Sequence, residues 1–159
     1  MSIEKVRAYF RQFGIEDRIR EFDVSSATVE LAAAALDVAP ERISKTLSFK
    51  SGDSCILILC AGDARIDNKK FKAQFGMKAK MPTSDEVLEL VGHPVGGVCP
   101  FGINPGVKVY LDQSMQRFDT VFPAAGSANS AIELSLDELF KYSGADCWVD
   151  VCKLPESES

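Results

Sequence analysis

The sequence lacks the cysteine pairings on which structural disulfides and zinc sites depend. Its five cysteines are odd in number and form no Cys-x-x-Cys motif, which argues against both a disulfide framework and a zinc knuckle. A reducing, cytoplasmic environment fits this pattern best. Four cysteines stand in apolar, strand-like runs and are expected to be small buried hydrophobic residues: Cys55, Cys60, Cys147 and Cys152.

The chain also lacks long apolar runs and contains one histidine, His93. No segment approaches the roughly 18 apolar residues that a membrane-spanning helix requires, so we expect no membrane partner. One histidine and dispersed cysteines do not make a metal-ligand set. The glycines lack the spacing of a phosphate-binding loop or a dinucleotide fingerprint. We therefore expect neither a metal nor another cofactor.

Positive charge is scarce overall. The net charge of −5 argues against sequence-independent coating of nucleic acid, which depends on neutralising many phosphates. The sign reverses in the basic segment, residues 65–80, where six lysines or arginines stand against Asp67 alone. Two interpretations of this segment stay open: a contact with phosphates, or a solvated helix face, which is the more common origin of such a run.

Apolar material is sufficient for one core, because 46% of the 159 residues are hydrophobic. We expect one domain at residues 1–154 and a frayed polar tail at 155–159, with a monomer as the default. The predicted fold class is mixed α/β, a single compact domain with a curled, mostly antiparallel mixed sheet surrounded by helices. Periodicity predicts helices at 1–13, 26–36, 67–75, 83–91 and 135–143, and strands at 19–22, 46–49, 55–60, 107–111, 120–122, 131–134 and 148–151.

Particular residues place several of these boundaries. Thr83 with Glu86, and Ser135 with Glu138, have the spacing of capping boxes. Ser26 is the expected cap of the second helix. The run at 55–60 is apolar on both faces and should form a central strand.

The glycine loop, residues 93–102, places three glycines and two prolines around Cys99. Adjacent glycines allow positive φ angles and let bare main-chain N–H groups approach a ligand, while Pro100 restricts the direction in which the chain leaves. Such a loop can present amides to an oxygen anion. The alternative is an ordinary turn between two core elements.

Two further features could carry chemistry. Lys45 falls where a helical turn passes into an apolar strand, and there it could hold a phosphate or stabilise developing negative charge; the alternative is a surface lysine beside a strand. Cys99 with His93 could form a nucleophilic pair, since a thiolate needs a nearby base. That second possibility would make the protein a cysteine-dependent hydrolase of small esters or thioesters.

Three segments together resemble the YbaK/ProX family of aminoacyl-tRNA deacylases, relatives of the editing domain of bacterial prolyl-tRNA synthetases. "SSATVELAAAALDVAPERISKTLSFK" is similar to the family's alanine-rich helix followed by Ile-x-Lys-Thr-Leu, and "GHPVGGVCPFG" to its Gly-x-x-x-Pro loop. "FPAAGSANSAIELSLDELFKYSGADCWVDV" is similar to its closing segment. The resemblance covers nearly the whole chain and implies a barrel-like sheet.

The resemblance implies trans-editing, the hydrolysis of the ester in mischarged aminoacyl-tRNA, without a cofactor. The implied partners are a tRNA acceptor end that carries a wrong amino acid and, as an open alternative, an aminoacyl-tRNA synthetase. Lys45 and Gly97 take the catalytic positions. The implied substrate-binding residues are Thr46, His93, Gly96, Val98, Cys99, Pro100, Gly126, Ser127 and Asn129.

The chain departs from the family pattern at two places. Many members carry serine where this chain has Cys99, and some carry aspartate where it has Ala131. The sequence is also compatible with a protein of another class, a non-catalytic module that binds tRNA ends or a synthetase through the basic segment.

Overall fold

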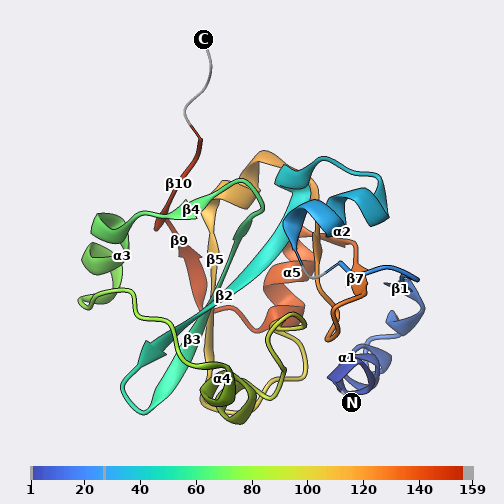
Figure 1. Cartoon of the computed structure of the whole chain (residues 1–159), viewed down its shortest axis with the longest axis horizontal. Coiled ribbons are helices and arrows are strands. Elements are labelled where there is room, and N and C mark those ends of the chain that lie inside the picture. The colour runs from blue at the N-terminus through green and yellow to red at the C-terminus, as the bar shows by residue number, and fades with distance from the viewer. Residues whose placement is uncertain (1, 27, 156–159) are drawn as a thin grey trace.

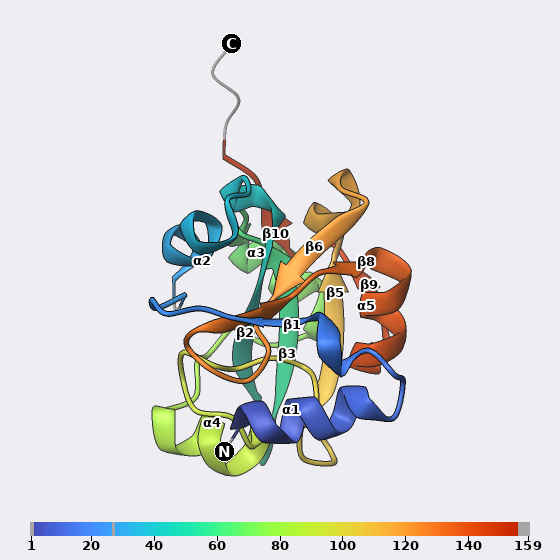
Figure 2. The ribbon, with the colours of Figure 1, turned by 90° about the vertical axis from the view of Figure 1, so that its right-hand side faces the viewer.

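A curled, six-stranded mixed sheet forms the centre of the computed structural model, which describes residues 2–26 and 28–155 (Figures 1 and 2). The strand order is β8-β6-β2-β3-β5-β9. The bounds are β2 Ile43–Ser51, β3 Ser54–Ala61, β5 Lys108–Asp112, β6 Thr120–Pro123, β8 Leu134–Ser135 and β9 Cys147–Val149. Except for Pro155, the predicted tail lies outside the described residues.

The remaining described strands form two short antiparallel pairs outside the central sheet. β1 (Ile19–Glu21) pairs with β7 (Ser130–Ile132), and β4 (Arg65–Ile66) pairs with β10 (Cys152–Lys153). Within the central sheet, β2–β3 and β6–β8 are antiparallel, whereas β2–β6, β3–β5 and β5–β9 are parallel. The predicted mixed α/β class is confirmed.

In the described part of the chain, five α-helices surround the sheet: α1 Ser2–Arg11, α2 Val29–Leu36, α3 Asn68–Phe75, α4 Ser84–Val91 and α5 Leu136–Ser143. α1 and α4 lie at one end of the β2–β3 hairpin and α2 at the other (Figure 2). Both predicted capping boxes, at Thr83 and Ser135, are confirmed. The predicted cap of α2 is wrong: Thr28 caps it by accepting from the Leu31 N–H at 3.1 Å, while Ser26 donates to the Ala128 carbonyl.

Several strand boundaries differ from the sequence prediction because pairing partners change along the chain. The single strand expected at 131–134 is two, since β7 pairs with β1 while β8 pairs with β6. The terminal strand expected at 148–151 ends early, because β9 stops at Val149, and β10 lies beyond the predicted range. β2 begins at Ile43, immediately after the 3₁₀ turn Pro40–Arg42, so Lys45 lies inside the strand rather than before it.

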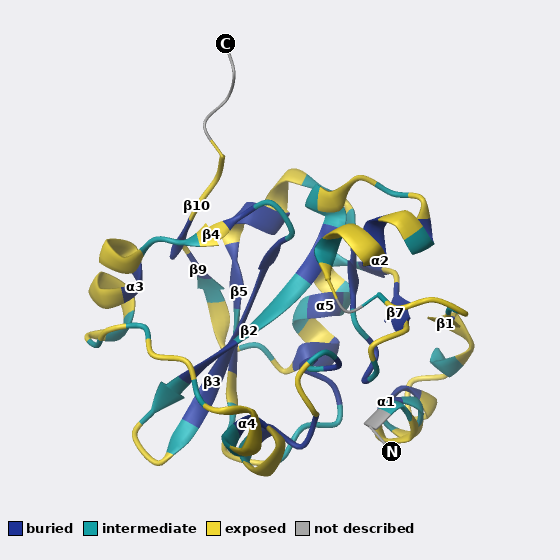
Figure 3. Cartoon of the chain, viewed as in Figure 1, coloured by how far each residue is buried: buried dark blue, intermediate teal, exposed yellow. Residues whose placement is uncertain are grey.

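The main core lies on both faces of β3, the strand predicted to be central. Leu57, Ile58, Leu59 and Cys60 are each fully buried, and Figure 3 shows the strand in the colour of burial along most of its length. A smaller apolar cluster joins α2 to β6 and contains Ala32, Ala33, Leu36, Ile43, Phe122 and Ala131. This second cluster supports one end of the candidate site.

One cysteine prediction is wrong. Cys55, Cys60 and Cys152 are buried as expected, but Cys147 is exposed. Cys147 is the first residue of β9, which is the edge strand of the sheet, so its side chain has no further strand beside it.

Candidate active site

A cleft of about 360 Å³ lies between β2 and the glycine loop. Its walls come from four parts of the chain: α2 and the residues before it, residues 43–48 of β2, residues 81–98, and residues 122–131. The cleft is at the small end of the roughly 300–1,000 Å³ that small-molecule sites occupy. Its size therefore suits a small group rather than an extended polymer.

The edge of β2 that faces the cleft is open. β6 pairs with β2 only at Ile43 and Ser44. The Lys50 N–H points away from β3 and donates to the Lys80 carbonyl at 2.7 Å. Since main-chain groups alternate sides along a strand, the peptide groups of Thr46 and Ser48 point to the same edge as that of Lys50. They can therefore offer N–H and C=O groups to a ligand in the cleft.

Lys45 lies on β2 at the wall of the cleft. Its side chain is half-buried, and its Nζ donates to the Gly62 carbonyl at 3.4 Å. Gly62 packs tightly, because a Cβ there would lie 2.1 Å from the Pro40 carbonyl oxygen and 2.7 Å from Cγ1 of Val29. The close approach of these backbones places the carbonyl that holds Lys45.

The electrostatic character of the cleft rests on this lysine. Among the described residues that line the cleft, Lys45 is the one with an ionisable side chain. The other polar side chains of the lining are serine and threonine hydroxyls, and the remainder is aliphatic or aromatic. The cleft therefore offers one positive charge and neutral hydrogen-bonding groups.

A row of hydroxyls lies along one face of β2. Ser44, Thr46 and Ser48 follow one another at two-residue spacing, and all three line the cleft. Ser44 donates to Sδ of Met115 at 3.2 Å. Oγ1 of Thr46 is buried and has no hydrogen-bond partner among the described residues. An unpaired buried hydroxyl costs stability unless a ligand or water satisfies it, so Thr46 is positioned to bond to whatever fills the cleft.

The glycine loop forms the opposite wall of the cleft. Gly96 has a φ of +98°, a conformation that residues with a Cβ rarely adopt. Gly97 has another constraint, because a Cβ there would lie 2.9 Å from Cα of Ser127 and 3.0 Å from the Gly126 carbonyl oxygen. Gly96 and Val98 line the cleft, whereas Gly97 lies behind them against the 124–130 turn.

Polar residues of the 124–130 turn bond to their own chain. The Ser127 hydroxyl donates to Oδ1 of Asn129 at 2.9 Å and lies 2.6 Å from the Ser130 hydroxyl. The Asn129 amide donates to the Phe22 carbonyl at 2.9 Å. Gly126, Ser127 and Asn129 are not among the cleft-lining residues; they hold the turn against which the glycine loop rests.

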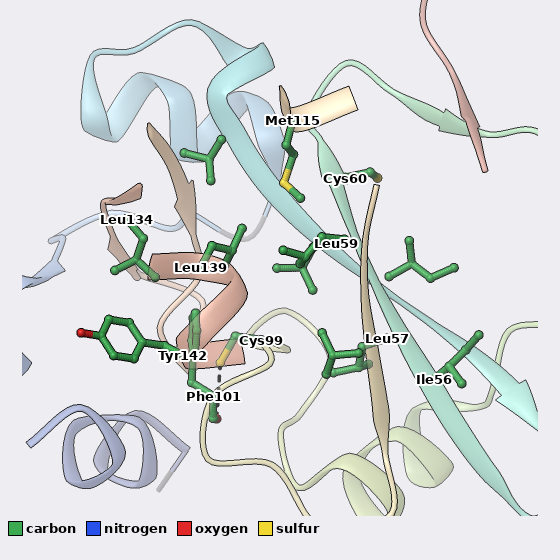
Figure 4. Packing of buried hydrophobic residues seen from close by; sticks show 14 of the residues in the cluster. Ile56, Leu57, Leu59, Cys60, Cys99, Phe101, Met115, Leu134, Leu139 and Tyr142 are labelled. Carbon is green, nitrogen blue, oxygen red and sulfur yellow. Dashed lines mark hydrogen bonds between the residues drawn. The ribbon is translucent and has the colours of Figure 1, made fainter. Parts of the chain in front are cut away.

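His93 and Cys99 point into the core, and neither lines the cleft. Figure 4 shows Cys99 among buried side chains of the core, with its contact to the Phe101 carbonyl drawn. Nε2 of His93 lies 2.7 Å from the same carbonyl. Because a carbonyl oxygen only accepts, Nε2 carries the proton and Nδ1 does not. Nε2, 3.6 Å from Sγ of Cys99, therefore has no lone pair with which to take the thiol proton.

Burial also opposes the nucleophilic pair energetically. It raises the pKa of the Cys99 thiol to about 12, since an apolar surrounding disfavours the thiolate. Desolvation lowers the pKa of His93, so the ring favours its neutral form. Pro100 is buried beside them. These three residues support the loop from its core side, and none of them lines the cleft.

Other lining residues gave little signal in the sequence. Ser44, Ser48 and Met81 belong to runs whose sequence indicates only a strand or a linker. Hydroxyls spaced two residues apart on a strand with an open edge were the one available signal.

The basic segment lies partly in ion pairs and partly in solvent. Lys70 pairs with Asp150 at 3.0 Å, and Lys69 and Lys72 are exposed on α3.

No helix within 2–26 and 28–155 is long and apolar enough to cross a membrane. Over the same residues, no three His, Cys, Asp or Glu side chains gather where they could hold a metal ion.

The chain is similar to proteins that contain an aminoacyl-tRNA editing domain. Residues 23–142 match the aminoacyl-tRNA editing domain family. The uncharacterised Bacillus subtilis protein YwhH is 54% identical over 154 residues, which cover 96% of this chain and 98% of that protein. A solved structure described as a candidate trans-editing enzyme for prolyl-tRNA synthetase has a TM-score of 0.85 and 28% identity, covering 96% of this chain and 97% of that one.

A more distant similarity is to a larger enzyme. The proline–tRNA ligase of Kosmotoga olearia is 36% identical over 86 residues, which are 54% of this chain and 15% of the ligase. The chain thus spans a small part of the ligases that it matches.

Proposed function

Because the chain belongs to the aminoacyl-tRNA editing domain family, we propose that it hydrolyses the ester joining a wrongly attached amino acid to the 3′ end of a tRNA. It acts in trans in the cytoplasm, on the acceptor end of the mischarged tRNA. The description of the solved neighbour as a trans-editing protein supports this proposal. A prolyl-tRNA synthetase is the synthetase with which it would cooperate, given the similarity to proline–tRNA ligases.

The observation that carries the proposal is the composition of the cleft, in which Lys45 is the one ionisable side chain of the described lining. Such a cleft has no acid–base pair and no activated nucleophile, yet an aminoacyl ester does not need either. The ester is already activated, so a positioned water and stabilisation of the developing oxyanion are sufficient.

In the proposed reaction, a water oxygen attacks the ester carbonyl carbon and the carbonyl oxygen becomes an oxyanion. Main-chain N–H groups of the glycine loop near Gly96 and Val98 stabilise that oxyanion, and Lys45 orients the ester or the adjoining phosphate. The bond to the ribose oxygen then breaks, one proton of the water ends on the ribose oxygen, and the other passes to solvent as the amino acid leaves as a carboxylate. The amine and ribose hydroxyl of the substrate relay the first of these protons, because the cleft provides no side-chain base.

The lining also limits which amino acid fits. A volume of about 360 Å³ must hold the aminoacyl group together with part of the terminal ribose. Ala131 lines the cleft at the position where some family members carry aspartate, so the lining has no negative charge there. A small aminoacyl group, held by the open edge of β2 and the free hydroxyl of Thr46, is the substrate that this lining favours.

The test is a panel of tRNAs mischarged with small amino acids, with release of the amino acid as the measurement. We expect turnover of at least one mischarged tRNA and no loss of the correctly charged one. Lys45→Ala should remove most of the activity, and Lys108→Ala, an exposed lysine at the start of β5, is the matched control. Absence of turnover across the whole panel would refute the proposal.

A non-catalytic module is the second candidate, favoured by the exposed lysines of α3. It predicts binding without turnover. Such binding would survive Lys45→Ala and disappear when Lys69 and Lys72 are neutralised.

A further inference from the structure

A second hollow adjoins the cleft at Lys45. Its volume is about 680 Å³, and it shares Lys45 and Val29 with the cleft. The remaining walls come from residues 62–65, which follow β3, and from residues 153–155 at the other end of the chain. The two cavities therefore adjoin each other at Lys45 and Val29.

The second hollow carries an excess of positive charge in a protein whose net charge is −5. Its cations are Lys45, Arg65 and Lys153. Asp63 also lines it, but its two carboxylate oxygens accept from Arg117 at 2.5 and 3.1 Å, so its charge is compensated. Glu30 is the remaining carboxylate of the lining. Three cations therefore stand against one uncompensated carboxylate.

Two of these cations stand opposite each other. Lys153 of β10 is the partner of Arg65 in β4, and directly opposed residues of an antiparallel pair share a face. Like charges in that position destabilise the pairing. Both side chains are exposed, and no ion pair of either is present among the described residues. An anion bound between them would turn this repulsion into two attractive contacts.

The lining also indicates which kind of anion fits. The described residues around the second hollow include no aromatic ring on which a base could stack, and stacking is the usual means of holding single-stranded bases. Arginine and lysine side chains instead suit phosphate oxygens. The chemistry therefore matches a sugar–phosphate backbone rather than a base.

We propose that the second hollow binds the phosphodiester backbone of the single-stranded tRNA end just before the aminoacylated nucleotide, with Arg65 and Lys153 as the phosphate ligands. This inference rests on the proposed function and adds the path of the substrate: the ester lies in the cleft, Lys45 stands at the junction, and the preceding phosphates lie in the second hollow. The basic segment contributes Arg65, and the far end of the chain contributes Lys153.

The experiment compares two substrates that carry the same wrong amino acid. One is the full mischarged tRNA, and the other is the aminoacyl ester of adenosine, which has no phosphodiester. The test variant is Arg65→Gln with Lys153→Gln. The control, Lys108→Gln with Lys141→Gln, removes the same charge from exposed positions outside both cavities, and thermal unfolding checks that each variant is folded.

We expect the test variant to lose at least about tenfold in kcat/KM on the full tRNA, mainly through KM, with a shallower dependence on salt by about one unit per lost phosphate contact. Hydrolysis of the adenosine ester should be unchanged, and the control should match the wild type on both substrates. Equal activity of test variant and wild type on tRNA would overturn the subsite while leaving the proposed function intact. Equal loss on both substrates would also overturn it, since that pattern indicates a structural defect.

A binding measurement separates the subsite from the hydrolase itself. A single-stranded RNA that ends in CCA, followed by fluorescence anisotropy, should bind the wild type and the control but bind the test variant at least about tenfold more weakly. That result would support the subsite even if the wild type hydrolysed neither substrate, an outcome that refutes only the proposed function. Unchanged binding by the test variant would refute the subsite.

Discussion

Gly97 lies against Ser127 so closely that no side chain fits between them, because a Cβ on Gly97 would come within 2.9 Å of Cα of Ser127. This contact joins the glycine loop to the 124–130 turn. At Gly97 the loop approaches another backbone directly, which leaves no room for a side chain there. The positions of the loop amides therefore depend on a glycine that itself lies behind the cleft.

Gly97→Ala should reduce the proposed deacylase activity by at least about tenfold, because the added methyl group forces the two backbones apart and moves the amides that face the ester. Steady-state hydrolysis of a mischarged tRNA measures the effect. Gly106→Ala is the control: φ at Gly106 is +92°, but a Cβ there would meet nothing within 4 Å. That variant should lose about 1–2 kcal/mol of stability and keep its activity. Equal activity of Gly97→Ala and wild type would contradict this role for the contact.

Lys45→Ala should lower kcat/KM by roughly 10²–10³-fold, the usual effect of removing one group that stabilises developing charge. Its single hydrogen bond, 3.4 Å long to the Gly62 carbonyl, contributes little to folding. The free energy of unfolding should therefore change by less than about 1 kcal/mol. Urea denaturation and single-turnover kinetics on the same preparation give both values. A large loss of stability with activity retained would mean that Lys45 is a structural residue.

Thiol reagents should modify Cys147 rapidly in the native protein and leave Cys99 untouched. Cys147 is exposed, whereas Cys99 is fully buried and its thiol has a pKa of about 12, so almost none of it is thiolate at neutral pH. A chromogenic disulfide reagent measures the fast phase, which Cys147→Ser should abolish. Cys99→Ser should retain deacylase activity. Loss of that activity in a folded Cys99→Ser protein would revive the cysteine-dependent hydrolase.

Stability should fall as pH is lowered through the ordinary range of histidine. Burial lowers the pKa of His93 in the folded protein, so below about pH 6.5 the unfolded chain binds a proton that the folded chain does not. The free energy of unfolding should decrease by up to about 1.4 kcal/mol per pH unit until the folded-state pKa is reached. Urea titrations at pH 7.5, 6.5 and 5.5 measure this slope.

His93 is the one histidine in the chain, which makes the attribution simple. In His93→Gln the slope between pH 7.5 and 5.5 should become nearly flat, whatever the absolute stability of that variant. A slope that persists in His93→Gln would assign the effect to carboxylates instead.

The sequence predicted well those features that depend on neighbouring residues. The capping boxes at Thr83 and Ser135 are local, because a side chain bonds to a main-chain group three residues away. The division of 131–134 into β7 and β8 was missed because it depends on two different partner strands. Single-sequence periodicity carries no information about a change of partner.

The candidate site was predictable in outline and not in the direction of its side chains. Lys45 and the glycine loop were identified from their residues and from the family resemblance, and both border the cleft. Cys99 and His93 were expected to face a ligand, yet both are fully buried. The backbone of a glycine-rich loop has no regular repeat, so the sequence does not indicate which of its side chains point toward the core.

The sequence by itself determined the apolar strand at the centre, the starts of α4 and α5 at their capping boxes, and the family, and it singled out Lys45, because each follows from short-range order or from a shared motif. Only the tertiary structure decided that Lys45 lines two adjoining cavities, that Gly97 meets Ser127, and that Arg65 faces Lys153. These relationships join segments far apart in the chain. They arise when the sheet curls and brings its loops and ends together, which no local pattern encodes.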